Sequence, residues 1–346
     1  MKKYLNRSLF YQGDSKIILP LILLYISSVI INNLIITSYF ENDLLRNLYS
    51  FNYGIDYLIN NFIGILYLII YICIAYIISV GVFKRKKWNT LLSGPFSRMD
   101  IRKREFFIIS MSALIYLIIF IGLIIQKIYI YYEVVRYVDF FMIKVLLDIL
   151  RIISISTIAI GGLALLDSFF SNLYYMVASI IFIFIYVIGI FVNYSYLISH
   201  YVESSYNRIS GTRIIINYLE GYYNNYDNYM GITIGISIFF IVAGLICLII
   251  GKKLTNKMLV ENMNEGIIFN FPKRILEFMI VTFPGIILSQ SIVEVINARY
   301  FYYNLNENNR FKFIIITIGV LTIISYISLK TVKKGLKNKK DRYYQI

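Results

Sequence analysis

The stretch that decides the fold is FFIISMSALIYLIIFIGLIIQ, residues 106–126. It is almost entirely apolar and contains no Asp, Glu, Lys or Arg. A membrane helix needs about 20 mostly apolar residues to cross about 30 Å of hydrocarbon. The stretch therefore predicts a helix that spans a membrane.

Seven further stretches of the chain have the same apolar character. The eight predicted spans are about 17–40, 60–83, 106–126, 140–166, 172–199, 230–251, 275–297 and 312–330. Only Asp167 to Ser171 separate the fourth span from the fifth, but about 60 residues are too many for a single crossing. The sequence thus predicts an all-α fold, a polytopic membrane helical bundle with about eight transmembrane helices.

The composition of the 346 residues supports this class, since 59% are hydrophobic and only 15% are charged. A soluble protein is roughly half apolar and about one quarter charged. High hydrophobicity also excludes intrinsic disorder. The net charge of +15 lies in short segments between apolar runs, so we expect no nucleic-acid partner. Cys73 and Cys247 lie inside such runs and indicate neither a disulfide framework nor a metal site.

The distribution of Lys and Arg predicts the orientation of the spans. With the N-terminus inside, the inner segments hold 24 of the 34 Lys and Arg residues and the outer segments hold 8. Segments on the cytoplasmic side carry the excess of positive charge in membrane proteins. We therefore expect an even number of spans, with both termini in the cytoplasm.

The inner segment between the second and third spans has the most ordered pattern. After a basic cluster, Trp88, Leu91 and Leu92 have the spacing of one face of a short amphipathic helix. Gly94-Pro95 ends that helix. Ser97 and Asp100 are N-cap candidates for the helix that becomes the third span. The product is a rigid knob between two membrane helices, apolar on one side and basic on the other.

This segment resembles a motif of a known family. Residues 90–101, TLLSGPFSRMDI, are similar to the loop between the second and third spans of ABC-2-type permeases, which reads Leu-Leu-Ser-x-Pro-x-Ser-Arg-x-Glu-Ile. The chain departs from it at Asp100, where Glu is commoner. In the family this loop is the coupling helix that docks into the ATPase subunit. The resemblance implies that role for Trp88, Leu91, Leu92, Pro95, Phe96, Arg98 and Asp100.

The family pattern also implies a domain organisation. It gives an amphipathic connecting helix at 1–16 and a six-helix permease core at 17–251, with the coupling loop at 84–105 and an extracellular loop at 199–229. Residues 252–330 add a cytoplasmic loop and two membrane helices, and 331–346 form a basic cytoplasmic tail. The tyrosine-rich run at 218–229 is typical of an interfacial loop, because a tyrosine ring is apolar and its hydroxyl is polar. Contact with a substrate is the alternative.

The resemblance implies a function as the membrane subunit of an ATP-driven exporter in the bacterial cytoplasmic membrane. The chain has no phosphate-binding loop of the Gly-x-x-x-x-Gly-Lys-Ser/Thr type. We therefore expect it to be no enzyme and to bind no cofactor, with ATP and Mg on two copies of a separate ATPase. A second, identical permease chain and membrane lipid are the other expected partners. The similarity to permeases of phenol-soluble-modulin and antimicrobial-peptide exporters implies an amphipathic or hydrophobic peptide substrate.

Three charged residues interrupt the fourth span. Lys144, Asp148 and Arg151 are spaced i, i+4 and i+7 and so share one helix face. One charge at the centre of a membrane helix costs about 2.5–3.5 kcal/mol on insertion scales. Asp148 can pair with either neighbour. The stripe is either a structural ion-pair contact with another helix or a polar wall of a translocation cavity.

Other functions remain as alternatives. A non-transporting sensor subunit that assembles with the same kind of ATPase fits the same sequence. An intramembrane enzyme needs metal ligands or an acid–base set inside the bilayer, but the only histidine, His200, begins an outer loop. A secondary transporter would have inverted repeats, and the first four spans do not correspond to the last four.

Overall fold

The computed structural model describes residues 15–44, 58–84, 98–138, 140–170, 173–202, 217–221, 226–257, 269–300 and 307–343. It is 94% helical and contains no strand within these ranges, which confirms the predicted all-α class. The predicted amphipathic segment 1–16 lies almost wholly outside the described residues.

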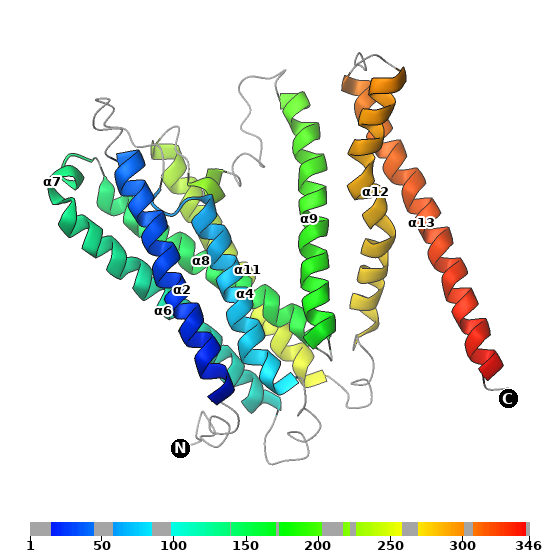
Figure 1. Ribbon diagram of the computed structural model, residues 1–346, viewed down its shortest axis with the longest axis horizontal. Helices are drawn as coiled ribbons and strands as arrows, with labels where there is room; N and C mark the ends of the chain where they lie inside the picture. The colour runs from blue at the N-terminus through cyan, green and yellow to red at the C-terminus, as the bar shows by residue number, and fades with distance from the viewer. Residues whose placement is uncertain are drawn as a thin grey trace. The chain divides into compact units, whose positions relative to one another are not determined.

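Each predicted span coincides with one long helix (Figure 1). The eight helices are α2 (Ser15–Ser38), α4 (Phe62–Lys84), α6 (Arg98–Ile130), α8 (Phe141–Phe169), α9 (Leu173–Val202), α11 (Tyr226–Lys257), α12 (Asn270–Tyr300) and α13 (Glu307–Tyr343). A π-helical turn, η1 (Tyr39–Leu44), extends α2, and a single turn, α7 (Tyr132–Val135), follows α6. Seven of the long helices are long and apolar enough to cross a membrane, and the described apolar stretch of α9, Tyr174–Ile190, is shorter.

The break between the fourth and fifth spans is where the sequence predicts it. Helix α8 ends at Phe169 and α9 begins at Leu173, so the two spans are separate helices. Most helices run a few residues beyond the predicted apolar stretches. Helix α13 extends furthest and continues through most of the predicted basic tail to Tyr343.

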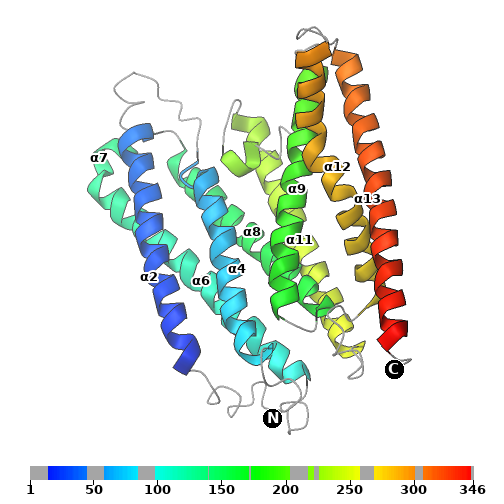
Figure 2. The same cartoon turned by 45° about the vertical axis from the view of Figure 1, so that its right-hand side comes forward.

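The chain divides into two compact units. Unit 1 contains residues 1–176 and 211–268, and unit 2 contains residues 177–210 and 269–346. Unit 1 therefore holds α2, α4, α6, α8 and α11, whereas unit 2 holds most of α9 with α12 and α13 (Figure 2). Packing thus groups the fifth long helix with the last two.

The packing directions in unit 1 are those of a chain that crosses back and forth. Helix α4 runs antiparallel to both α2 and α6. Helices α2 and α6 therefore run parallel to each other. The hydrogen-bonded pairs are Tyr25 with Ser112, Asn32 with Tyr116, Ser27 with Tyr67, Tyr71 with Ser112 and Tyr76 with Arg102. Alternating crossings of a membrane produce this order.

Unit 2 obeys the same rule. Helices α9 and α12 run parallel. The rings of Phe182 and Phe283 lie 5.1 Å apart between centroids, and further along both helices, about two turns on in α9 and one turn on in α12, Gly189 lies beside Ile286. Two parallel spans need an odd number of crossings between them along the chain, and α11 is the one long helix between α9 and α12 in the described residues. Helix α13 packs back against α12, where Gly285 lies close to the carbonyl of Ile318.

A cluster of tyrosines joins α2, α4 and α6. The rings of Tyr67, Tyr71 and Tyr116 lie within 6.3 Å of one another. Each hydroxyl is hydrogen-bonded inside the bundle: Tyr67 with Ser27 at 3.0 Å, Tyr71 to the carbonyl of Ser112 at 2.9 Å, and Tyr116 to Asn32 at 3.0 Å. Because these polar groups are satisfied internally, the three helices form one block.

The distribution of polarity is that of a membrane protein. Large apolar side chains face outward, as Leu19 with 66% exposure and Phe278 with 65% exposure illustrate. Charged side chains such as Arg102, Asp148 and Arg151 are buried. Hydrocarbon favours this arrangement, because intramembrane charges face the bundle interior and pair there. The chain is a multi-pass membrane protein.

Candidate functional site

The predicted ATPase-coupling residues belong to the connection between α4 and α6. Trp88, Leu91, Leu92, Pro95 and Phe96 lie outside the described residues, which stop at Lys84 and resume at Arg98. Arg98 and Asp100 are in the first turn of α6. Residues 98–105 of the predicted 84–105 loop are therefore helical, and helix α6 begins directly after the N-cap candidate Ser97.

Beyond this connection along the chain, α6 contributes to a buried set of ionic side chains and one tyrosine. We name it the inner charge cluster and define it as Tyr76, Arg102, Glu105 and Asp167. Arg102 Nη1 donates to Asp167 Oδ2, to Glu105 Oε2 at 3.1 Å and to the hydroxyl of Tyr76 at 3.4 Å. Its Nη2 donates to the carbonyl of Ala164 at 3.1 Å. All four side chains of the cluster are buried.

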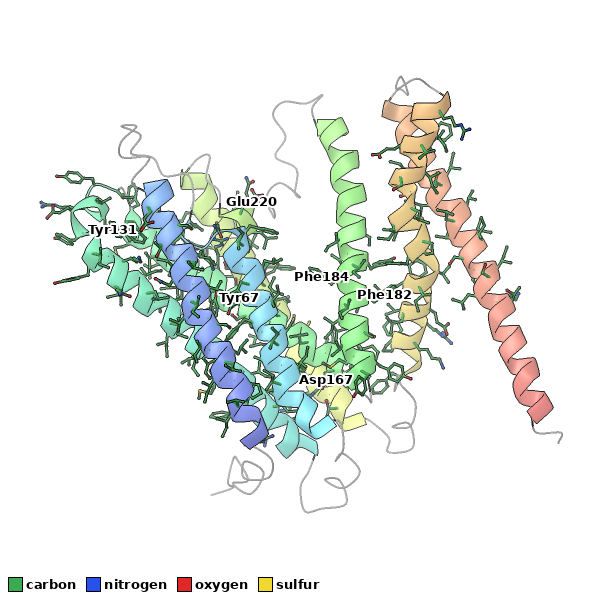
Figure 3. All side chains as sticks on the ribbon, viewed as in Figure 1. Tyr67, Tyr131, Asp167, Phe182, Phe184 and Glu220 are labelled. Atoms are coloured by element: carbon green, nitrogen blue, oxygen red, sulfur yellow. The ribbon has the colours of Figure 1, made fainter. Side chains whose placement is uncertain are left out.

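Three helices supply the inner charge cluster. Arg102 and Glu105 are spaced i, i+3 on α6, Tyr76 comes from α4, and Asp167 from the last turn of α8. Figure 3 shows Asp167 at the end of unit 1 where α4 ends and α6 begins, whereas Tyr131 and Glu220 lie at the opposite end. One guanidinium therefore ties α6 to both α4 and α8.

The sequence does not predict the inner charge cluster. It places Arg102 among the basic residues of a cytoplasmic segment and Asp167 at the start of a short loop. Helix α8 instead continues to Phe169, and Arg102 neutralises the buried Asp167 carboxylate in its last turn. The sequence signal is weak: Arg102 and Glu105 are spaced for one face, but nothing along the chain links them to Asp167.

The three predicted stripe residues of the fourth span are all buried. Lys144 is 4% exposed, and Asp148 and Arg151 are fully buried, on one face of α8 as predicted. Of the two pairings that the sequence leaves open, the pair between Asp148 Oδ1 and Arg151 Nη1 is present, at 2.9 Å.

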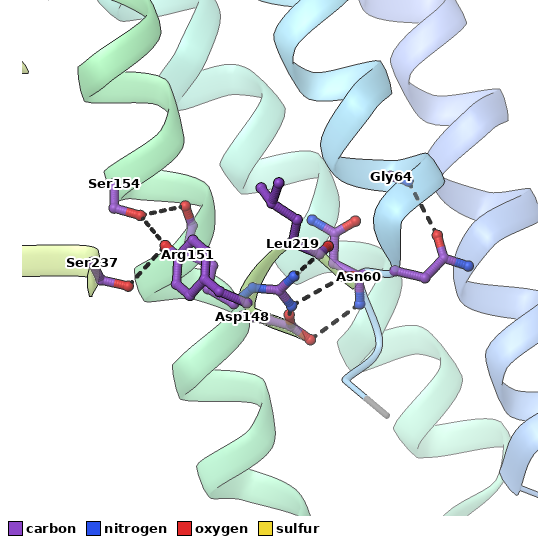
Figure 4. Close-up of polar contacts among 9 residues, drawn as sticks. Asn60, Gly64, Asp148, Arg151, Ser154, Leu219 and Ser237 are labelled. Carbon is purple, nitrogen blue, oxygen red and sulfur yellow. Dashed lines mark hydrogen bonds and ion pairs between the residues drawn. The ribbon is translucent and has the colours of Figure 1, made fainter. Parts of the chain in front are cut away.

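Around this pair lies a second set of contacts, the outer charge cluster, which we define as Asn60, Asp148, Arg151, Tyr218 and Leu219 (Figure 4). Arg151 Nη1 also donates to the carbonyl of Asn60 at 3.1 Å, and Nη2 donates to the carbonyl of Leu219 at 3.0 Å. The backbone N–H of Asn60 donates to Asp148 Oδ2 at 3.2 Å. The pair thus binds main-chain groups of two connecting segments, which favours the structural interpretation of the stripe over a cavity wall.

Tyr218 differs from the interfacial role expected for the tyrosine-rich run. It is fully buried in the helical turn at 217–220, and its hydroxyl lies 2.8 Å from Ser154 Oγ of α8 and 3.0 Å from Ser237 Oγ of α11. The guanidinium carbon of Arg151 lies 5.5 Å from the centre of its ring. Two serines on facing helices supply the hydroxyl partners that a buried tyrosine needs, and neither is marked by the sequence pattern.

Gly221 lies beside the guanidinium of Arg151 at the edge of the outer charge cluster. Its carbonyl accepts from the N–H of Leu58 at 2.8 Å, and its φ of +73° is left-handed. A Cβ at this position would lie 2.9 Å from Arg151 Nη1. The turn therefore requires a residue without a side chain.

We expect Gly221→Ala to lower the free energy of unfolding by about 1–2 kcal/mol, the usual cost of a left-handed non-glycine residue, with a further contribution from the crowded guanidinium. Titration of the purified chain with SDS in mixed micelles measures this. The control is Gly231→Ala in α11, where a Cβ meets no described atom within 4 Å. Equal effects of the two substitutions would contradict the geometry of this turn.

No protein-family model, curated protein or solved structure matches the chain. Within the described ranges, no group of three or more His, Cys, Asp or Glu side chains lies where it could hold a metal ion. The fold and the two buried charge clusters define the class, a multi-pass helical membrane protein in which Arg102 joins three helices and the Asp148–Arg151 pair binds main-chain groups of two connecting segments.

Proposed function

We propose that the chain is the permease subunit of an ABC exporter in the bacterial cytoplasmic membrane, with both termini on the cytoplasmic side. A separate ATPase docks on the loop at 88–104. The observation that carries the proposal is that the segment with the permease motif joins, along the chain, two helices that are both bound to α8. The inner charge cluster makes this connection, because Arg102 of α6 contacts Tyr76 of α4 and Asp167 of α8.

This placement suits the transmission of force. Two permease chains face each other, and two ATPases bind beneath them. When ATP draws the ATPases together, each coupling loop moves with its ATPase. When the loop moves, the ends of α4 and α6 that it joins move too. Arg102 transmits this displacement to α8 through its contacts with Asp167 and the carbonyl of Ala164.

The resemblance to peptide exporters supports an amphipathic or hydrophobic peptide as the substrate. Such a peptide enters from the membrane or cytoplasm and leaves on the outer side. Arg102 and Arg151 are buried in the bundle and already bound to carboxylates and carbonyls, so we expect apolar surface to supply most of the contact with this substrate.

The test is co-purification of the chain with the ATPase encoded beside it, followed by ATP hydrolysis in lipid with and without amphipathic peptide. We expect a stable complex whose hydrolysis responds to peptide. Leu92→Asp or Phe96→Asp removes apolar docking surface and is expected to abolish the complex. The control is Tyr137→Asp, which changes an exposed aromatic residue in the turn after α7. A folded chain that forms no complex in mild detergent would contradict the proposal.

A further inference from the structure

We propose that Arg102 is the positioning residue that joins the coupling loop to α8, and that α8 carries the displacement to the outer segment 217–221. This inference rests on the proposed function and specifies the route by which the ATPase would act on the far side of the membrane. The route lies entirely within unit 1.

The inner joint is a single guanidinium with partners on three helices. Arg102 lies near the start of α6 and binds Asp167 and the carbonyl of Ala164, both on α8. It also reaches Tyr76 on α4. Only 3% of Arg102 is exposed, so the ATPase cannot contact it and its effect must pass through these partners. Breaking a buried pair leaves an uncompensated charge, so the joint holds while the loop moves.

Arginine is required here because the joint uses both terminal nitrogens. Nη1 binds the carboxylates and Nη2 binds the main-chain carbonyl of Ala164. A lysine ammonium is a point charge on a flexible chain and cannot hold this fork geometry. Arg102→Lys therefore keeps the charge and loosens the joint.

Helix α8 connects the contacts of Arg102 with those of Arg151 as one continuous helix. It is continuous from Phe141 to Phe169 and packs against α11 at backbone distance. A Cβ at Gly244 would lie 2.5 Å from the carbonyl of Thr157, and a Cβ at Gly251 would lie 3.3 Å from the carbonyl of Ala164. Two helices in such close contact move as a pair, because sliding requires the backbones to separate.

The outer joint repeats the chemistry of the inner one. Arg151 of α8 binds a carboxylate, Asp148, together with the main-chain carbonyls of Asn60 and Leu219. Tyr218 inserts between α8 and α11 through Ser154 and Ser237. The segment 217–221 is therefore attached to the α8–α11 pair and follows its movement.

The test uses the complex of the chain with its ATPase in lipid nanodiscs. The readout is the exchange of backbone amide hydrogens in 217–221 with and without Mg and a non-hydrolysable ATP analogue. In the natural chain we expect the analogue to change this exchange at least about fivefold, the lower range of allosteric coupling. In Asp167→Asn and in Arg102→Lys we expect no change upon addition of the analogue.

A second readout is peptide transported per ATP hydrolysed in proteoliposomes. Both variants should lower this ratio at least about tenfold, within the usual range of coupling between sites, while the complex still assembles. The control is Tyr186→Phe, which removes a part-buried 2.8 Å contact between the Tyr186 hydroxyl and Thr282 Oγ1 in unit 2. It should preserve both the exchange response and the ratio.

The outcomes separate this inference from the proposed function. If the natural complex transports peptide but 217–221 does not respond to the analogue, the inference is wrong and the exporter stands. The inference is also wrong if 217–221 still responds in both variants. If the natural complex neither hydrolyses ATP nor transports peptide, the proposed function fails first. A variant that does not assemble is replaced by the other one, because Arg102→Lys and Asp167→Asn loosen the same joint from opposite sides.

Discussion

Replacing Arg151 by Met is expected to lower the free energy of unfolding by about 3–5 kcal/mol, the range measured when one partner of a buried ion pair is removed. The substitution leaves the Asp148 carboxylate fully buried with the N–H of Asn60 at 3.2 Å as a neutral donor. It also takes a donor from each of the carbonyls of Asn60 and Leu219. Unfolding in SDS mixed micelles measures the loss.

Two further variants make this result specific. Lys103→Met changes an exposed basic residue on α6 and should alter stability by less than about 0.5 kcal/mol. Asp148→Asn combined with Arg151→Met removes both charges, and it should be more stable than Arg151→Met alone, because no unpaired charge remains. An effect of Arg151→Met no larger than that of Lys103→Met would contradict the buried pair.

The second large effect is expected at neighbouring glycines of α8. Gly161→Ala should lower the free energy of unfolding by about 1–3 kcal/mol, the usual cost of overpacking a tight interface. A Cβ at Gly161 would overlap the main-chain carbonyl of Gly244, so α8 and α11 must separate to admit it. Because the obstacle is backbone, no side-chain rotation relieves the clash.

Gly162→Ala is the matched control. A Cβ at Gly162 meets no described atom within 4 Å. Alanine in a helix is better than glycine by about 0.5–1 kcal/mol, so this variant should be neutral or slightly stabilising. Thermal unfolding of both variants in the same detergent gives the comparison. Similar changes for the two would show that α8 and α11 do not pack at Gly161.

These two glycines illustrate what the sequence does and does not predict. A Gly-Gly pair permits close helix packing and is common in membrane helices. The sequence does not show which of Gly161 and Gly162 faces a neighbour, because that neighbour, α11, lies far along the chain. The positions of the spans were predictable, since the length of an apolar run reflects the thickness of the bilayer. Helix ends were less predictable: α6 starts at Arg98 and α13 continues to Tyr343, where charged residues extend a helix beyond the apolar stretch.

Some features of the candidate sites could also be predicted from the sequence, and others could not. The burial of Lys144, Asp148 and Arg151 followed from their spacing and from the cost of exposing charge to lipid. The main-chain partners of Arg151 could not be predicted, because they lie in segments at 58–60 and 217–221 that only the fold brings together. The coupling motif at 90–101 remains a prediction, since most of it lies outside the described residues.

We propose that this membrane protein moves a peptide with energy from ATP. The most direct measurement is the uptake of a fluorescent amphipathic peptide into inside-out vesicles that contain the chain and its ATPase. We predict that ATP and Mg drive accumulation in the lumen, that Leu92→Asp abolishes it, and that Tyr137→Asp does not. Steady ATP hydrolysis by the assembled complex without any peptide uptake would contradict the exporter and identify a sensor instead.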